Sequence, residues 1–421
     1  MDELARRHRA IALLKAGTKV ADICREVGRT RQWLAKWRAR FDELGQAGLV
    51  ARSHAPKRHP WTTPTRVVRA ILAARDRLER RARGREFAGI GADAVAWELE
   101  LARARPIPSR RTIERVLARH GRTARLALPA PRQYSGPYPA PRAKGPGDLQ
   151  ESDLVGPRYL RTPKGPQCFF SFHTVDVAGG GAVAFQFEDK SSESFCVYLL
   201  EVVWPVLGIP CIWQVDNEAA LAGLPGRPHV FTQPVRLALL LGVEVRFIPE
   251  GEPGRQADIE SYNRLWQERV LRRFDCPGLG RLARVSDRFG RWYMTARPHP
   301  KLSLAEHGTR FPAALLASLD GELRRPPRGF SLDDHRDQRG EIHLPLARGR
   351  ISWVRRVDEH GHVRVIDRDL RLGRRAADRY VIATLYTGIR KVRVRLGDEV
   401  VHDFRFEIRE TLVQPLVRRG R

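Results

Sequence analysis

The sequence predicts a multidomain protein with all-α units at the N-terminus, an α/β domain in the centre and a small β-barrel at the C-terminus. Its 421 residues are enough for about three domains of roughly 150 residues each. Apolar residues recur with helical spacing up to about residue 120, with strand spacing from 148, and in shorter alternating runs from about 342. Each change of period predicts a change of fold class.

Residues 2–44 have the apolar spacing of three short helices, with breaks at Gly17 and Gly28. This spacing is typical of a helix-turn-helix DNA-binding domain, which we place at 1–48. Thr30 is in position to cap the third helix, whose N-terminal half would then meet base edges and phosphates. The residues expected to contact DNA there are Arg31, Gln32 and Lys36. A three-helix bundle with a solvated basic face is the alternative.

A second helix-turn-helix-like domain is expected at 65–121. Helices are predicted over about 66–82 and 92–101, and a third follows the capping residue Ser109. The cations that this third helix would present to DNA are Arg110, Arg111 and Arg115. Two tandem units suit a protein that reads a long DNA site, whereas the alternative is a module used only for packing.

Two linkers separate the predicted domains. Residues 49–64 mix Pro, His and cations without periodicity, and Lys57 and Arg58 in this basic linker are expected to lie along a DNA groove. Residues 122–147 are rich in Pro and Gly, which disfavour both helix and central strand. Extended chain is therefore expected at both places.

The central domain, expected at 148–320, combines strands and helices. The predicted strands span about 149–155, 168–177, 182–187, 210–217 and 243–248, and the helices span about 192–207, 235–241 and a stretch from 256 onward. Three antiparallel strands followed by alternating helix and strand are the element order of a ribonuclease H-like α/β domain. In such a sheet the first and fourth strands are neighbours.

From about 340 to 415 the chain alternates apolar and charged residues in short runs punctuated by Gly. Short strands with turns roughly every ten residues predict a small β-barrel. Its outward cations would track phosphates or simply face solvent. Those expected to contact DNA are Arg390, Lys391 and Arg393.

The net charge of +28 points to a polyanionic partner, and nucleic acid is the leading candidate. Basic and acidic residues number 33 and 13 in 1–147, 12 and 17 in 148–275, and 31 and 18 in 276–421. An acidic centre between two basic arms suits a protein that gathers divalent cations to act on DNA phosphates. Codon bias explains the use of Arg over Lys, but it does not explain the excess of cations.

The sequence has no apolar run long enough to cross a membrane, and its first residues do not have the pattern of a secretory signal. Its five Cys are scattered, without a close Cys/His quartet or a disulfide framework. We therefore expect a cytoplasmic protein without structural zinc, disulfides or a membrane partner.

Three carboxylates are expected to converge in the central domain. Asp153 ends the first predicted strand, Asp216 lies at the tip of the fourth, and Glu260 is in the first turn of the next helix. Carboxylate oxygens are preferred ligands of Mg²⁺. Two such ions, roughly 3.5–4 Å apart, can activate the attacking oxygen and stabilise the leaving oxygen of a phosphodiester. The predicted cofactor is a pair of Mg²⁺ ions, with Mn²⁺ as the substitute.

Four segments contain or follow these residues: ESDLVGP, VDN, ADIESYNRLWQERV and RWYMTARPHPKLSLAEHGTRFPAAL. Together they resemble the integrase core of bacterial insertion-sequence transposases and retroviral integrases, over about 148–315. The resemblance implies that Asp153, Asp216 and Glu260 are the Asp-Asp-Glu metal ligands of a transposase. Such an enzyme cleaves transposon ends and transfers them to target DNA. A bacterial, nucleoid-associated protein that works as a homo-oligomer on double-stranded DNA is then expected, and the lack of an N-terminal His/Cys quartet favours the transposase side.

The sequence departs from that family at two places. Glu218 follows the Asp-Asn pair where the family has Gly, and Gln-Ala at 256–257 replaces an Asn-Gly shortly before the catalytic Glu. Glu260 follows Asp216 by 44 residues, whereas Glu252 follows it by 36. Glu252 sits in a Gly/Pro loop that is not expected to fix its direction. Glu260 opens a helix with a buried apolar face, so we prefer it as the third ligand.

Two other functions stay open at this stage. A catalytically decayed or domesticated relative would bind DNA as a sequence-specific regulator without cutting it. A structure-selective nuclease with the same fold is disfavoured, because tandem helix-turn-helix units imply docking at a specific sequence.

Overall fold

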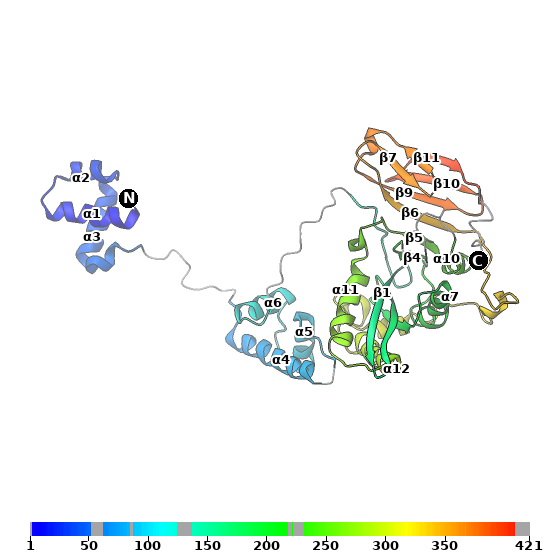
Figure 1. Cartoon of the computed structure of the whole chain (residues 1–421). Helices are drawn as coiled ribbons and strands as arrows, with labels where there is room; N and C mark the ends of the chain where they lie inside the picture. Colours follow the sequence, from blue (N-terminus) through cyan, green and yellow to red (C-terminus); the bar gives the residue numbers. More distant parts are fainter. Residues whose placement is uncertain are drawn as a thin grey trace. The chain divides into compact units, whose positions relative to one another are not determined.

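The computed structural model describes residues 2–51, 62–84, 87–123, 137–217, 221, 231–366 and 368–408. The chain divides into two compact units, Met1–Pro64 and Thr65–Arg421, and Figure 1 shows it coloured from the N-terminus to the C-terminus. None of the helices within the described ranges has the length and hydropathy that a membrane crossing requires.

The first unit consists of α1 (Glu3–Lys15), α2 (Val20–Val27), α3 (Arg31–Leu44) and a 3₁₀ helix at Gly45–Leu49. Gly28 ends α2 in the left-handed conformation, with a φ of 67°. Thr30 then caps α3, because its hydroxyl accepts a hydrogen bond from the Trp33 amide at 3.2 Å. The residues buried between the helices include Ala10, Ile23, Val27 and Leu34. The predicted three-helix unit and its cap are confirmed.

The second unit begins with three more helices, as the sequence predicts. They are α4 (Thr65–Arg83), α5 (Ala92–Leu101) and α6 (Arg110–Arg119). Ser109 caps α6 by accepting a hydrogen bond from the Thr112 amide at 3.3 Å. Apolar residues of all three helices share one core that includes Val67, Ile71, Val95, Leu99, Ile113 and Val116.

A nine-stranded sheet forms the centre of the second unit, in the order β11-β10-β9-β6-β5-β4-β1-β2-β3. Its first five strands along the chain are β1 (Leu149–Thr162), β2 (Gly165–Asp176), β3 (Ala182–Phe187), β4 (Ile212–Val215) and β5 (Glu244–Phe247). β2 is antiparallel to β1 and β3, whereas β4 is parallel to both β1 and β5. This order and these directions are those of a ribonuclease H-like sheet, and the predicted contact between the first and fourth strands is confirmed.

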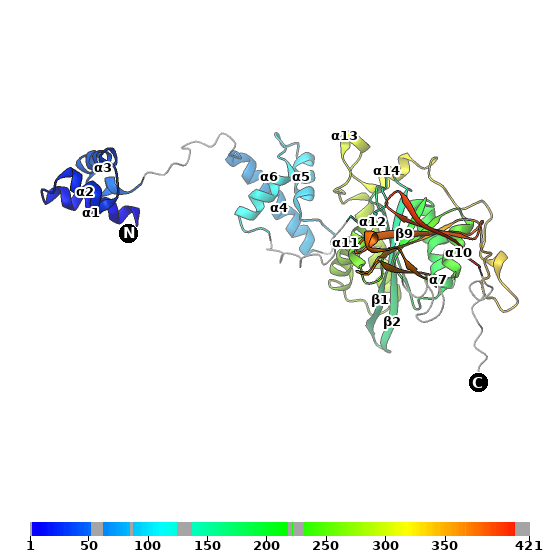
Figure 2. The ribbon, with the colours of Figure 1, turned by 90° about the horizontal axis from the view of Figure 1, so that it is seen from above.

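Helices cover both faces of this part of the sheet. One set is α7 (Ser192–Val197), a π-helical turn (Tyr198–Val203), α8 (Trp204–Leu207) and α10 (Gln233–Leu240). The other is α11 (Ala257–Trp266), a π-helical turn (Gln267–Leu271) and α12 (Leu279–Thr295). Figures 1 and 2 show α7 and α11 on opposite sides of β1. Two short helices follow, α13 (Leu304–His307) and α14 (Pro312–Ser318).

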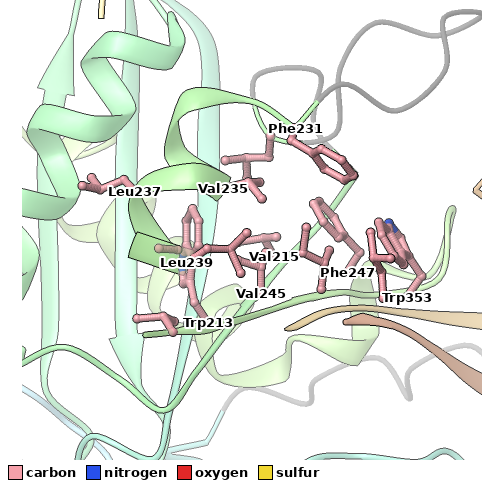
Figure 3. Packing of buried hydrophobic residues seen from close by; sticks show 14 of the residues in the cluster. Trp213, Val215, Phe231, Val235, Leu237, Leu239, Val245, Phe247 and Trp353 are labelled. Atoms are coloured by element: carbon pink, nitrogen blue, oxygen red, sulfur yellow. The ribbon is translucent and has the colours of Figure 1, made fainter. Parts of the chain in front are cut away.

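The alternation of side chains along β2 explains why two cores form. Phe172 packs in the core on the α7 and α10 side, and Phe169 packs in the core on the α11 and α12 side. Residues separated by an odd number of positions point to opposite faces of a strand. Figure 3 shows the first of these cores, where Val215 and Val245 from neighbouring strands meet Val235 of α10.

The separate small β-barrel expected at the C-terminus is not confirmed. The C-terminal strands are β6 (Arg350–Arg356), β7 (His362–Val365), β8 (Arg368–Arg371), β9 (Tyr380–Tyr386), β10 (Lys391–Leu396) and β11 (Glu399–Arg405). β6 pairs parallel with β5, so that β6, β9, β10 and β11 extend the central sheet, while β7 and β8 pair with each other. The alternation of apolar and charged residues predicts strands, but it does not predict that the first of them, β6, pairs with the open edge of β5.

Aromatic packing strengthens this continuation of the sheet. Trp353 of β6 stacks on Phe247 of β5 with the ring centroids 6.0 Å apart, and Figure 3 shows both rings in the same core as Val245. The C-terminal strands therefore share the hydrophobic core of the central domain.

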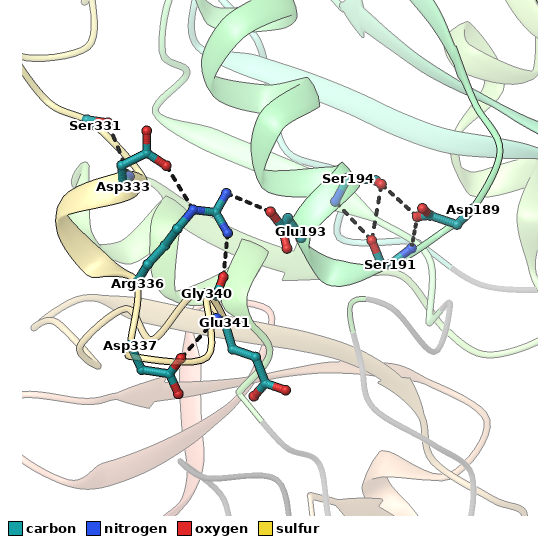
Figure 4. Close-up of polar contacts among 10 residues, drawn as sticks. All are labelled: Asp189, Ser191, Glu193, Ser194, Ser331, Asp333, Arg336, Asp337, Gly340 and Glu341. Carbon is teal, nitrogen blue, oxygen red and sulfur yellow. Dashed lines mark hydrogen bonds and ion pairs between the residues drawn. The ribbon is translucent and has the colours of Figure 1, made fainter.

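Arg336 fixes the segment that leads to β6. Its guanidinium donates to Glu193 in the first turn of α7 at 2.6 Å, to Asp333 at 2.8 Å and to the Gly340 carbonyl at 2.6 Å, as Figure 4 shows. Hydrogen bonds to these two carboxylates raise the pKa of Arg336, so the side chain stays charged. The segment between α14 and β6 is thereby tied to the central domain.

Candidate active site

The three candidate carboxylates come from β1, the end of β4 and the start of α11. Ser152 of β1 pairs with Val215 of β4, so Asp153 and Asp216 each follow one member of this pair. Glu260 is in the first turn of α11. β1 runs on to Thr162, with a register shift between Val155 and Arg158. Asp153 thus lies within a long strand and not at its end, which corrects the expected strand boundary.

Two hydrogen bonds hold α11 against β1. The Ile259 amide donates to Glu151 at 3.1 Å, and the Asn263 side chain donates to Asp153 at 2.5 Å. Glu151 and Asp153 are two residues apart on the strand, a distance of about 6.6 Å, and Ile259 and Asn263 are four residues apart on the helix, a distance of about 6 Å. The two hydrogen bonds can therefore form at the same time. Glu260 lies on the helix between these two attachment points, and its charge acts on Asp153 of β1.

Glu151 is a site residue that the sequence analysis missed. It is buried, and burial raises the pKa of its carboxyl to about 7. It accepts hydrogen bonds from the amide near the start of α11 and from Gln214 at 3.2 Å. The available signal was its position two residues before Asp153, which puts both side chains on one face of the strand.

The three carboxylates share one electrostatic environment. Burial and, to a smaller extent, the charges of Asp216 and Glu260 together raise the pKa of Asp153 to about 6, against the hydrogen bonds from Leu154 and Asn263. A divalent cation would relieve this repulsion between carboxylates, and an all-oxygen donor set is the kind that Mg²⁺ prefers. The residues present therefore fit the expected cofactor.

An open cavity of about 460 Å³ lies along α11 and is lined in part by Glu260. Arg264 and Arg272 line it as well, and both are exposed. A carboxylate at the edge of an open groove with cations further along is accessible to a phosphodiester strand.

The sequence predicts that nothing in the loop fixes the direction of the Glu252 side chain, and the structure shows that this prediction is wrong. It is 5% exposed. Its carboxylate pairs with Arg255 at 2.8 Å and accepts hydrogen bonds from the Tyr380 hydroxyl at 2.8 and 2.9 Å. Tyr380 belongs to β9, so a contact 128 residues away along the chain fixes the direction of this carboxylate.

We expect Glu252→Gln to lower the free energy of unfolding by about 1–3 kcal/mol, because hydrogen bonds to a buried charged group contribute on that scale. Glu260→Gln, at a site open to solvent, is expected to change stability by much less. Chemical denaturation of both variants beside the wild type measures the difference. A Glu252→Gln protein as stable as the wild type would contradict the structural role.

The residues expected to contact DNA differ in their surroundings. Arg31, Gln32 and Lys36 are exposed on α3, and Arg111 and Arg115 are exposed on α6. Arg110 pairs with Asp93 at 3.3 Å and with Glu114 at 2.9 Å. Lys391 and Arg393 both pair with Asp403, at 2.8 and 3.7 Å, and Arg390 is exposed. Lys57 and Arg58 lie outside the described residues.

One acidic group in the described ranges has the compactness of a metal site. Atoms of Asp337, Glu341 and His343 lie within 4.8 Å of one another, and all three residues are exposed. Asp337 also accepts hydrogen bonds from the amides of Arg339 and Glu341 at 2.7 and 3.0 Å. These hydrogen bonds show that Asp337 stabilises a tight turn, which accounts for the closeness of the three side chains without a metal ion.

Residues 7–66 match the protein family described as winged helix-turn helix. Among solved structures, the chain is similar to the intasome of simian T-cell lymphotropic virus in complex with PP2A regulatory subunit B56 gamma, at 14% identity and a TM-score of 0.33. That match covers 56% of this chain and 76% of the other. The HTLV-2 integrase catalytic core domain in complex with magnesium matches at 16% identity and a TM-score of 0.28, over 38% and 93% of the two chains. The catalytic core domain of BIV integrase matches at 12% identity and a TM-score of 0.29, over 42% and 97%.

Proposed function

We propose that the chain is an Asp-Asp-Glu transposase, which binds transposon-end DNA and catalyses metal-dependent strand cleavage and strand transfer. The observation that carries the proposal is the junction of β1, β4 and α11, where Asn263 of α11 donates a hydrogen bond to Asp153. Burial, together with the charges of Asp216 and Glu260, raises the pKa of Asp153 there. The ribonuclease H-like strand order supports it, because this order puts β1 beside β4, so that Asp153 lies next to the end of β4. The acidic centre and basic arms of the chain add further support.

In this proposal Asp153, Asp216 and Glu260 hold two Mg²⁺ ions, or Mn²⁺ in their place. Bound there, the ions supply activation of the attacking oxygen and stabilisation of the leaving oxygen of a phosphodiester. The protein keeps Asp153 in one orientation through its hydrogen bond with Asn263. Glu260 faces the open cavity, and Arg264 and Arg272 offset the charge of a DNA strand that lies along α11.

The proposed partners are the transposon ends and a double-stranded target DNA, bound by a homo-oligomer of the chain in a bacterial, nucleoid-associated setting. The exposed residues of α3 and α6 are the proposed readers of the ends. The winged helix-turn helix match over 7–66 supports DNA binding by the first unit. Lys391 and Arg393 both form ion pairs with Asp403. Its negative charge offsets part of their positive charge, so these two residues attract phosphate less than the sequence alone suggests.

The test of this function is an assay for metal-dependent cleavage and joining of duplexes that carry the inverted repeats flanking the coding sequence. The alternative of a decayed regulator differs in one respect: the wild type would bind these duplexes specifically and leave them intact. Measuring binding and joining of the same duplexes in parallel therefore distinguishes a transposase from a regulator.

Replacing both Arg31 and Gln32 with Ala in the full-length chain should reduce the preference for end DNA over scrambled DNA. A good base contact contributes about 1–3 kcal/mol of discrimination, so a loss of roughly tenfold or more is expected. Competition binding at several salt concentrations measures both specificity and the salt slope. Arg9→Gln is the matched control, because Arg9 lies on α1 and pairs with Glu26 at 2.8 Å. An unchanged preference in the double variant would contradict the assignment of α3 as the reading helix.

A further inference from the structure

A chain of buried polar side chains connects β3 to Asp153. It starts at Gln186 and passes through Ser171 and His173 of β2 and Asn263 of α11. The donor Nε2 of Gln186 lies 2.9 Å from the Ser171 hydroxyl, which lies 2.7 Å from Nε2 of His173. Nδ1 of His173 lies 2.6 Å from Oδ1 of Asn263, and Nδ2 of Asn263 donates to Asp153 at 2.5 Å.

The chemistry of the end group sets the direction of every hydrogen bond in this chain. The Asp153 carboxylate accepts, so the Asn263 amide presents Nδ2 to it and Oδ1 to His173. Nδ1 of His173 must then carry the proton, and in a neutral ring Nε2 becomes the acceptor for the Ser171 hydroxyl. The Ser171 oxygen in turn accepts from Gln186.

The end of this hydrogen-bonded series that lies away from Asp153, at Gln186, is held in place by further contacts. Gln186 Nε2 also lies 3.1 Å from the Ser286 hydroxyl, which accepts a hydrogen bond from the Trp266 indole at 2.9 Å. The His173 ring lies edge to face against Tyr262 and Trp266, with centroids 5.3 and 4.8 Å away. His173 and Ser171 are 0% exposed, and burial lowers the pKa of His173 to about 4, so the ring is neutral near pH 7.

We propose that Ser171 and His173 are positioning residues for Asp153, which lock the Asn263 amide in the one orientation that donates to this carboxylate. His173 is the cross-strand partner of Asp153, but the side chains of His173 and Ser171 act on the Asp153 carboxylate through Asn263. Without the bond from His173, the Asn263 amide can turn its oxygen toward Asp153, where two acceptors would repel. The inference rests on the proposed function, because it takes Asp153 to be a metal ligand.

A role in metal binding differs measurably from a role in stability alone. A buried hydroxyl or imidazole needs a hydrogen-bond partner in any case, so its loss lowers stability wherever it lies. Residues that orient a metal ligand also change metal affinity, and their loss typically weakens it about 10–100-fold. The affinity for Mn²⁺ is therefore the measurement that separates the two roles.

The protein contains a second buried serine, Ser152, that serves as a matched control for Ser171. Ser152 is 1% exposed and adjoins Asp153 in the sequence. Its hydroxyl lies 2.7 Å from the Thr174 hydroxyl and accepts a hydrogen bond from the Trp213 indole at 2.8 Å, so it belongs to a different set of contacts. Ser152→Ala and Ser171→Ala thus each remove a buried hydroxyl, but only the second lies in the chain that leads to Asp153.

The experiment measures Mn²⁺ binding to full-length protein by the electron paramagnetic resonance signal of the free ion, with thermal melts to show that each variant is folded. We expect His173→Phe, which keeps a ring between Tyr262 and Trp266, to weaken the Asp153-dependent binding about 10–100-fold. Ser171→Ala should weaken it in the same direction, and Ser152→Ala should leave it unchanged. His173→Asn, whose amide can replace Nδ1 as donor to Asn263, should bind more tightly than His173→Phe.

Asp153→Asn identifies which part of the account fails if these results do not appear. Loss of Mn²⁺ binding in Asp153→Asn together with wild-type affinity in Ser171→Ala and His173→Phe would overturn the positioning role and leave the proposed function standing. Equal weakening by Ser152→Ala and Ser171→Ala would overturn it as well. Unchanged Mn²⁺ binding in Asp153→Asn would overturn both the positioning role and the metal site.

Discussion

Asp153→Asn, Asp216→Asn and Glu260→Gln should each reduce DNA cleavage and joining by at least about 10³-fold while binding end DNA as the wild type does. Each change removes one negative donor from the junction of β1, β4 and α11. Stabilisation of transition-state charge by a bound metal contributes several kcal/mol, and about 1.36 kcal/mol corresponds to a factor of ten in rate. None of the three residues lies on α3 or α6, so DNA affinity should be retained.

Asp258→Asn is the control for this series. Asp258 is also an acidic residue in the first turn of α11, but it pairs with Lys301 at 2.7 Å. The variant should keep most of the joining activity, measured as labelled product per unit time with Mg²⁺ or Mn²⁺. Undiminished joining by any of the three site variants would remove that residue from the proposed site. Loss of activity in Glu252→Gln with full activity in Glu260→Gln would move the third ligand to the loop.

Removal of residues 340–421 should unfold the central domain. β6 hydrogen-bonds to the edge of β5, and the core on that face includes side chains from the removed segment. The fully or nearly fully buried ones include Leu344, Ile351, Trp353, Val357, Val381, Leu385, Val392 and Val394. Burial of one such side chain contributes about 1.5–3 kcal/mol. Loss of several would exceed the roughly 5–15 kcal/mol by which a typical domain is stable.

A protein of residues 65–421 is the matched truncation, because it keeps the whole second unit and removes only the first. We expect it to melt cooperatively, as followed by circular dichroism, whereas residues 65–339 should show no cooperative transition and should aggregate. A folded 65–339 protein with the melting temperature of 65–421 would show that the C-terminal strands are an independent domain, as the sequence alone led us to expect.

Local signals in the sequence predicted the parts of the fold that depend on neighbours along the chain. Thr30 and Ser109 are caps because each precedes an apolar run with helical spacing, and both accept the expected amide hydrogen bond. The order of strands and helices from 148 onward predicted that β1 and β4 adjoin. It also led to the three candidate carboxylates, since Asp216 follows β4 and Glu260 begins α11. Asp153 was placed at the end of the first strand, although β1 runs on to Thr162.

Contacts between distant segments could not be predicted in this way. The pairing of β6 with β5 joins residues about a hundred positions apart, and alternation in either strand does not encode its partner. The environment of Glu252 depends on Tyr380 in β9, so the loop sequence around Glu252 contains no sign of it. The same holds for His173 and Asn263, whose contact spans 90 residues.

The most direct test of the central claim is the joining of radiolabelled end duplexes to a target plasmid by the wild-type protein over a range of Mg²⁺ and Mn²⁺ concentrations. The duplexes carry the inverted repeats that flank the coding sequence, and any partner protein required is included. We expect nicked ends and covalently joined products that depend on the metal and disappear with chelation. Specific binding of the same duplexes without any cleavage or joining under all of these conditions would contradict the claim and identify the chain as a DNA-binding regulator.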